Sequence, residues 1–203
     1  MMLKRALATI SATLMMATVA CAADDYQLTG KPSTQRDDGK IEVVEFFWYG
    51  CPHCFSFEPY LAEWEESLAE DVVIRREAPD LNSSWKPHSQ AFYAAELMGV
   101  SHLMHKPLFD AIHKEKQPLR TLESIGSFVE TLGIDKEKFL STAKSFAVEG
   151  RISQARKLAI QYGLTGVPAV VVNGKYRTSA SFAGGNEKWT AVIDRLVEQE
   201  RNN

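Results

Sequence analysis

The spacing of apolar residues predicts a strand, a helix and a second strand near the start of the chain. Residues 41–49 (IEVVEFFWY) are β-branched or aromatic on both alternating faces, which is typical of a central strand covered on both sides. Gly50 ends this run. Pro52, tolerated at the first position of a helix, opens a helical pattern that runs to about Ala69. A second strand is expected at 72–78.

The middle of the chain predicts a block of helices. Between about residues 84 and 155 no convincing strand pattern occurs, and helical stretches are separated by residues that commonly interrupt helices. These interruptions are Gly99, Pro107, Pro118, Gly133 and Gly150.

The end of the chain predicts a helix, a hairpin, a loop and a final helix. Asn173-Gly174 is a strong hairpin signal, because both residues tolerate the positive φ of a tight turn. The expected bounds, in chain order, are 151–162 for the helix, 169–172 and 175–178 for the two strands, 179–185 for the loop, and 186–200 for the final helix.

This order of elements predicts the α/β fold class, a thioredoxin fold with an inserted α-helical domain. The βαβ start and the ββα end supply the fold, and the helical block interrupts it. We expect the thioredoxin-fold domain to comprise residues 23–83 and 156–203, and the inserted helical domain to comprise residues 84–155.

The first residues have the form of a secretory signal. A basic start precedes an uncharged run, 6–20, and Ala20-Cys21-Ala22 has the small–x–small form of a cleavage site. The run is shorter than the ~20 apolar residues that cross a bilayer. We therefore expect residues 1–22 to be a cleaved signal peptide. A lipid anchor on Cys21 is the alternative.

Charge and cysteine content narrow the chemistry. The formal charge is −3, and removal of the two basic residues of the signal gives −5, so nucleic acid is not an expected partner. Cleavage leaves two of the three cysteines, Cys51 and Cys54. A bridge between them would close a tiny loop and constrain the unfolded chain little. The pair therefore indicates chemistry more than stabilisation.

Cys51 stands where a helix begins directly after a central strand. The free N–H groups and positive dipole of a helix start favour an anion, and the thiolate is the reactive form of cysteine. Cys54, one turn later, can attack a mixed disulfide formed at Cys51. A strongly acidic cysteine has a pKa of about 4, and lowering the pKa of Cys51 from about 8.5 to that value would require roughly 4 kcal/mol at pH 7. A helix start supplies only about 0.3–2 kcal/mol of this. His53 and local donors must therefore contribute.

Metal binding and haem attachment are less well supported interpretations of the Cys-x-x-Cys pair than redox chemistry. A structural zinc site needs four ligands, and His102 and His105 are spaced more closely than the histidines of zinc fingers. Haem attachment needs a histidine where Phe55 stands. We expect a redox pair without a metal; an inert structural bridge remains the third alternative.

Glu45 is a carboxyl group in the middle of the apolar strand. One interpretation is a buried acid with a raised pKa that relays the proton of Cys54 during exchange. The other is a carboxylate that reaches solvent, as we expect for Glu42. Other polar and aromatic residues are assigned no catalytic role. Trp48 and Tyr49 are expected to pack or to border the site, and Trp85 to pack at the domain boundary, with an apolar substrate surface as the alternative. We expect four histidines to be structural or solvated: His88, His102, His105 and His113.

Three segments together resemble the DsbA family of periplasmic thiol–disulfide oxidases. They are EFFWYGCPHC at 45–54, Gly166-Val167-Pro168, and VNGKY at 172–176, and the resemblance covers nearly the whole mature chain. It supports the relay role of Glu45 and implies a cis Val167–Pro168 peptide facing the active site. The Val167 backbone would then pair with an extended substrate segment, as in strand addition.

The resemblance also implies an activity and partners. The protein would pass its disulfide to reduced exported proteins in the periplasm of a Gram-negative bacterium, and a DsbB-type membrane protein would reoxidise it. No cofactor beyond the redox-active disulfide is expected. A reductase or isomerase of the same fold is the nearest alternative, and a zinc-stabilised or lipid-anchored binding module is the alternative from another class. The expected site residues are Cys51, Pro52, His53, Cys54, Glu45, Val167 and Pro168.

Overall fold

A mixed five-stranded sheet lies at the centre of the part of the chain that the structure describes. A computed structural model gives residues 25–34 and 36–202, so the expected signal peptide lies outside the described residues. The strands are β1 (Gln27–Leu28), β2 (Ile41–Phe46), β3 (Val72–Glu77), β4 (Ala169–Val172) and β5 (Tyr176–Thr178). Their order is β1-β5-β4-β2-β3, with β2 and β3 parallel and the other pairs antiparallel.

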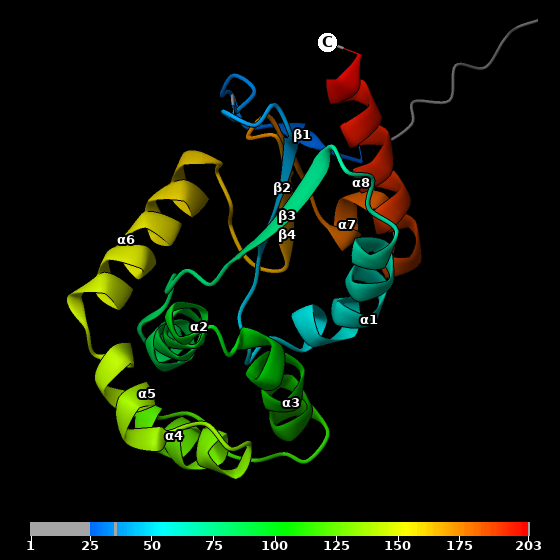
Figure 1. Cartoon of the computed structure of the whole chain (residues 1–203). Helices are drawn as coiled ribbons and strands as arrows, with labels where there is room; N and C mark the ends of the chain where they lie inside the picture. Colours follow the sequence, from blue (N-terminus) through cyan, green and yellow to red (C-terminus); the bar gives the residue numbers. More distant parts are fainter. Residues whose placement is uncertain (1–24, 35, 203) are drawn as a thin grey trace, which may run out of the picture.

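Helices cover the sheet and form a separate group beyond its end. On one side of the sheet lie α1, α7 and α8, α6 lies on the other, and α2 to α5 form the group beyond (Figure 1). The bounds are α1 (Pro52–Glu66), η1 (Ser83–Trp85), α2 (Lys86–Met98), α3 (Ser101–His113), α4 (Leu122–Thr131), α5 (Lys136–Ala143), α6 (Phe146–Gln161), α7 (Ala180–Ala183) and α8 (Asn186–Arg201).

The two faces of β2 enter different cores, which explains its apolar pattern. Val43 packs with Phe57 of α1 and Trp189 of α8, whose rings stack 4.0 Å apart. Val44 and Phe46 belong to the core beneath α6 on the opposite face. Burial on both sides selects apolar residues on both faces, with Glu42 and Glu45 as the exceptions, so the period of two disappears from the sequence.

The predicted strand 41–49 is three residues too long. β2 ends at Phe46, and Phe47 and Tyr49 instead enter the core of the helical group, where their rings pack 5.1 Å apart. Sheet core and helical core are both apolar, so the composition of the run cannot mark the point where it leaves the sheet.

Several predicted breaks and bounds are also corrected. Pro107 lies inside α3 and Gly150 inside α6. Buried residues on either side of each, among them Leu108 and Ile152, anchor these helices to the core and override the local preference. The expected loop 179–185 contains the single turn α7, in which the Phe182 N–H donates to the hydroxyl of the N-cap residue Ser179. α1 ends at Glu66, three residues before the expected end.

The arrangement of elements is that of a thioredoxin fold, as the sequence predicts. The hairpin turn has the expected positive φ at Asn173 (48°) and Gly174 (72°). The Lys175 N–H closes the turn by donating to the Val172 carbonyl at 3.0 Å. The division at 155/156 stays a prediction, and α6 runs across it as one helix. No helix within the described residues is long and apolar enough to span a membrane.

Candidate active site

A tight turn carries the chain from β2 into α1 and fixes the position of Cys51. The Cys51 N–H donates to the Trp48 carbonyl at 2.9 Å, and Cys51 has extended backbone angles at the N-cap of α1. Pro52 occupies the first helical position, where its missing N–H costs nothing. Glycine is required at Gly50, because a Cβ there would lie 2.3 Å from the Trp48 ring.

The Cys51 thiol is made acidic by donors within one helical turn. The Cys54 thiol donates to the Cys51 sulfur, and the backbone N–H groups of Cys54 and His53 point toward it, with the Cys54 nitrogen at 3.4 Å. Together with the charge of His53, these donors outweigh partial burial and lower the pKa of Cys51 from 9.0 to about 6. The sequence-based expectation of contributions beyond the helix dipole agrees with this arrangement.

Cys54 has the opposite environment. Its side chain is fully buried, and both cysteines are present as thiols. Burial, followed by the hydrogen bond and the charge of Cys51, raises the pKa of Cys54 well above its ordinary value. A deprotonated Cys51 beside a protonated Cys54 is the reduced state that this geometry favours.

Val167 and Pro168 lie beside the reactive sulfur, although they are far away in the sequence. Their peptide bond is cis, as the resemblance implies. The Cys51 sulfur is 3.5 Å from the Val167 carbonyl oxygen. A shallow cleft of about 380 Å³ starts here, and its lining includes the segment 163–169 and Phe182 of α7. His53 and Pro52 are exposed at the start of α1, so this rim is open to solvent.

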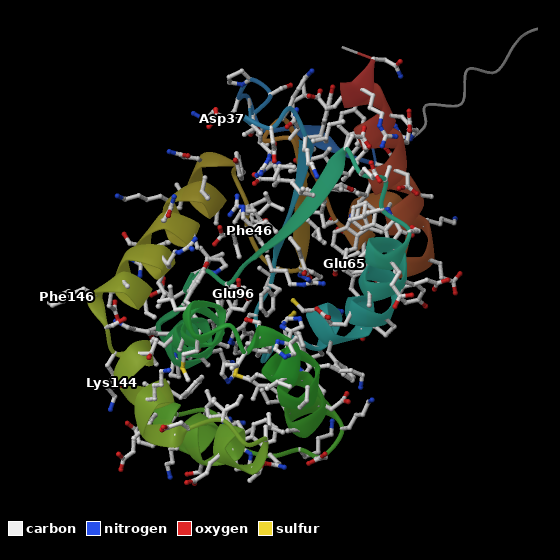
Figure 2. The ribbon with its side chains drawn as sticks, viewed as in Figure 1. Asp37, Phe46, Glu65, Glu96, Lys144 and Phe146 are labelled. Carbon is white, nitrogen blue, oxygen red and sulfur yellow. The ribbon has the colours of Figure 1, made fainter. Side chains whose placement is uncertain are left out.

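Glu45 is a fully buried carboxyl group on β2, as one of the two interpretations proposed. The parallel register places it opposite Arg76 of β3, whose Nε lies 3.1 Å from its Oε2. Arg76 also binds Glu65 of α1 at 2.8 Å (Glu65 is labelled in Figure 2). Burial first, and then the nearby charge of Glu58, outweigh Arg76 and raise the pKa of Glu45 from 4.5 to about 8. Glu45 is therefore neutral at pH 7.

The groups around Glu45 border a second, larger cleft. It has a volume of about 780 Å³ between α1, α3 and β3, and Glu58, Glu65 and Arg76 are among its lining residues. The buried acid is thus separated from the cleft by polar side chains that can carry protons or bind water.

The sequence did not single out Arg76 or Glu58, although weak signals existed. Glu58 stands four residues after Cys54, so the two share one helix face. Arg76 becomes visible only once β2 and β3 are paired in register. The structure also corrects the expectation for Glu42: it does not reach solvent but is buried, 7% exposed, and its two carboxylate oxygens each lie 3.1 Å from the Arg75 guanidinium.

Among the residues that the structure describes, His, Cys, Asp and Glu side chains do not gather in a group of three or more that could hold a metal ion. The Cys51 sulfur instead lies next to the Cys54 thiol, the Cys54 N–H and the Val167 carbonyl.

A thioredoxin fold with an acidic thiol at the start of its first long helix, paired with a buried thiol three residues later, defines a thiol–disulfide oxidoreductase. The DSBA-like thioredoxin domain family matches residues 66–197, downstream of the cysteine pair. The chain is 46% identical over 202 residues to the thiol:disulfide interchange protein DsbA of Pseudomonas aeruginosa, covering 95% of each, and 37% identical to that of Burkholderia cepacia, covering 94% of this chain and 91% of the relative.

Solved structures give the same result. The crystal structure of Pseudomonas aeruginosa DsbA superimposes with a TM-score of 0.84, covering 90% of this chain and 95% of that one, at 46% identity. The structure of DsbA from Xylella fastidiosa gives 0.81 at 32% identity, covering 88% and 96%. The chain belongs to the DSBA-like thioredoxin family.

Proposed function

We propose that this protein is a periplasmic oxidase that donates the Cys51–Cys54 disulfide to reduced, newly exported proteins. The observation that carries the proposal is the acidity of the Cys51 thiol. A thiol that ionises easily is a good leaving group, so the reduced protein is stabilised and the disulfide is readily given away. Relatives named thiol:disulfide interchange protein, at 35% to 49% identity, support it.

The reaction transfers two electrons in two exchange steps. A substrate thiolate attacks the Cys51 sulfur, the Cys51–Cys54 bond breaks, and the Cys54 sulfur takes up a proton. A second substrate thiolate then attacks the substrate sulfur of the mixed disulfide and releases Cys51 as a thiolate. The substrate dithiol is oxidised to a disulfide, and the cysteine pair is reduced.

Glu45 is proposed to supply the proton that Cys54 needs. It is protonated at neutral pH, buried on the strand that leads to the cysteines, and close enough that its charge would raise the pKa of Cys54. Glu58 and Arg76 connect its surroundings to the larger cleft, from which the proton can be replaced.

Val167 and Pro168 are proposed to hold the substrate, and Pro52 and His53 to complete the reactive turn. Because the Val167 carbonyl faces the Cys51 sulfur, an extended substrate segment bound to the Val167 backbone would bring its own cysteine to the point of attack. We further propose cleavage of a signal peptide, reoxidation by a DsbB-type membrane protein, no cofactor beyond the disulfide, and the domain division at 83/84 and 155/156.

The test is oxidation of a reduced, unfolded secretory protein by stoichiometric amounts of the oxidised protein. Loss of substrate thiols, with matching appearance of thiols on Cys51 and Cys54, is expected, and equilibration with glutathione should show a disulfide more oxidising than an ordinary one. A potential typical of reductases would favour the reductase or isomerase alternative. Stoichiometric zinc in the purified protein, with no dithiol oxidation, would contradict the proposal.

A further inference from the structure

Tyr49, at the centre of the turn before Cys51, is held at both of its polar ends by one helix. Its ring is buried, with 1% of the residue exposed. His113 Nε2 lies 2.7 Å from the Tyr49 carbonyl oxygen, and His105 Nδ1 lies 2.9 Å from the Tyr49 hydroxyl. Both histidines belong to α3, and they stand eight residues apart, a little more than two helical turns.

The chemistry of the partners fixes where the protons sit. A carbonyl oxygen only accepts, so His113 carries a proton on Nε2 and donates it to Tyr49. His105 Nε2 faces Glu58 of α1 at 3.3 Å, which favours a proton on that nitrogen as well. The Nδ1 of a neutral His105 then accepts from the Tyr49 hydroxyl. Each end of Tyr49 thus has a defined partner.

The rings around Tyr49 make this attachment rigid. Tyr49 packs edge-on against Phe109 of α3 at 4.9 Å, and His113 stacks on Phe55 of α1 at 4.8 Å with 13° between the planes. Phe55 directly follows Cys54. The same face of α3 therefore contacts the residues on both sides of the cysteine pair.

Small shifts of this turn matter because Cys51 depends on directed donors. Its sulfur accepts from N–H groups at the start of α1, and hydrogen bonds weaken steeply as distance and angle depart from the optimum. The Tyr49–Gly50 segment is closed by one backbone hydrogen bond, from Cys51 to Trp48. Additional fixed points are needed to hold it.

We propose that His105 and His113 are positioning residues of the redox reaction: by holding Tyr49, they hold Cys51 in the geometry that stabilises its thiolate. The helical group is then part of the active-site apparatus, not only a cover over it. This role goes beyond the expectation from the sequence, in which both histidines are structural or solvated. The inference rests on the proposed oxidase function.

Two substitutions at position 113 separate the effect of the hydrogen bond to Tyr49 from the effect of side-chain volume. In His113→Gln the amide nitrogen can take the place of Nε2 and still donate to Tyr49, whereas His113→Leu fills the space without a donor. We expect His113→Leu to weaken the equilibrium oxidation of glutathione by about 2- to 10-fold, the usual effect of one hydrogen bond, and to raise the pKa of Cys51. His113→Gln should restore most of the loss.

Position 105 offers a matched set. The amide of His105→Asn reaches the place of Nδ1, toward Tyr49, and that of His105→Gln reaches the place of Nε2, toward Glu58. We expect His105→Asn to retain the original Cys51 pKa and glutathione equilibrium, and His105→Gln to lose them. Tyr49→Phe removes one hydroxyl and keeps the ring, so it should fold and should resemble His105→Gln.

The outcomes distinguish this inference from the function on which it rests. Failure of the unaltered protein to oxidise a dithiol overturns the function. Suppose instead that the unaltered protein is active, and that His113→Leu, His105→Gln and Tyr49→Phe lose thermal stability while the Cys51 pKa and the glutathione equilibrium stay unchanged. The histidines would then be structural only, and the inference would be wrong. If His113→Leu does not fold, Tyr49→Phe and the position 105 pair decide the matter.

Discussion

Three donors face the Cys51 sulfur, the Cys54 thiol and the backbone N–H groups of Cys54 and His53, and the His53 side chain adds its charge. That charge can be removed without removing any of the donors. His53→Ala keeps the N–H of residue 53 but deletes its positive charge. We expect the pKa of Cys51 to rise above about 6 yet remain below 9.0, because the Cys54 thiol and the N–H groups still donate. Ultraviolet absorbance of the thiolate against pH measures it.

Cys51→Ser, which should abolish the titration, assigns this signal to Cys51. An unchanged pKa in His53→Ala would remove the imidazole from the mechanism and leave the local thiol and N–H donors as the whole cause.

The raised pKa of Glu45 leads to a second prediction, about how the stability of the protein depends on pH. The folded protein keeps the Glu45 proton up to about pH 8, whereas the unfolded chain loses it near 4.5. Between these values the folded state binds more protons, so the group lowers the free energy of unfolding as pH rises, by up to about 1.4 kcal/mol per pH unit. Glu45→Gln should lack this loss.

Urea unfolding of the oxidised proteins across this range measures the difference, because the cysteines cannot titrate while they form a disulfide. Parallel pH profiles of the two proteins would show that Glu45 is already ionised in the folded state. In exchange assays, Glu45→Gln should slow the step in which Cys54 takes up its proton.

The proposed site residues that could be predicted from the sequence are those with a local signal. Cys51, Pro52, His53 and Cys54 form one continuous motif, and Glu45 is conspicuous as a carboxyl group in an apolar strand. Arg76 carries no such mark, because its importance arises from strand pairing. The neighbours of Tyr49 on α3 are set by packing between distant segments, which a periodic pattern does not encode.

At the scale of elements, the successes and errors of sequence interpretation follow the balance between local and tertiary forces. The Asn173-Gly174 hairpin was predictable because its backbone angles are set by the turn residues themselves. Gly150 was misleading, because the buried residues of α6 stabilise the helix despite the poor helix propensity of glycine.

Gly150 also gives a prediction about α6. Its backbone is helical, and a Cβ there would meet nothing within 4 Å. Gly150→Ala should therefore stabilise the protein by about 0.4–1 kcal/mol, because alanine restricts the unfolded chain and favours helix. Gly133→Ala is the matched control: space is equally open, but φ is +80°, so it should destabilise. Thermal or urea unfolding compares them, and equal effects would contradict this view of α6.

At the scale of the whole molecule, the site is assembled from parts that the sequence keeps far apart. The sheet brings Glu45 and the loop of Val167 to the cysteines, and α3 reaches the same turn from the helical group (Figure 1). The order of elements predicted the thioredoxin fold. The docking of the helical group was not predictable, because many packings of amphipathic helices satisfy the same pattern.

The free energy of unfolding of the reduced protein should depend directly on the low pKa of Cys51. Its pKa is about 6 in the folded, reduced protein and 9.0 as the ordinary value, so the stabilisation is complete above pH 9 and is lost as pH falls through 6. It amounts to about 4 kcal/mol in full but to about 1.4 kcal/mol at pH 7, equivalent to roughly 30 mV of oxidising strength.

The reduced protein and reduced Cys51→Ser form the comparison, since serine does not titrate in this range and most other pH effects cancel. The difference between their unfolding free energies should grow by about 3 kcal/mol from about pH 5 to about pH 8.5. A difference that stays constant over this range would mean that the folded protein does not favour the thiolate. The fold would stand, but Cys51 would lose the property that makes its disulfide easy to give away.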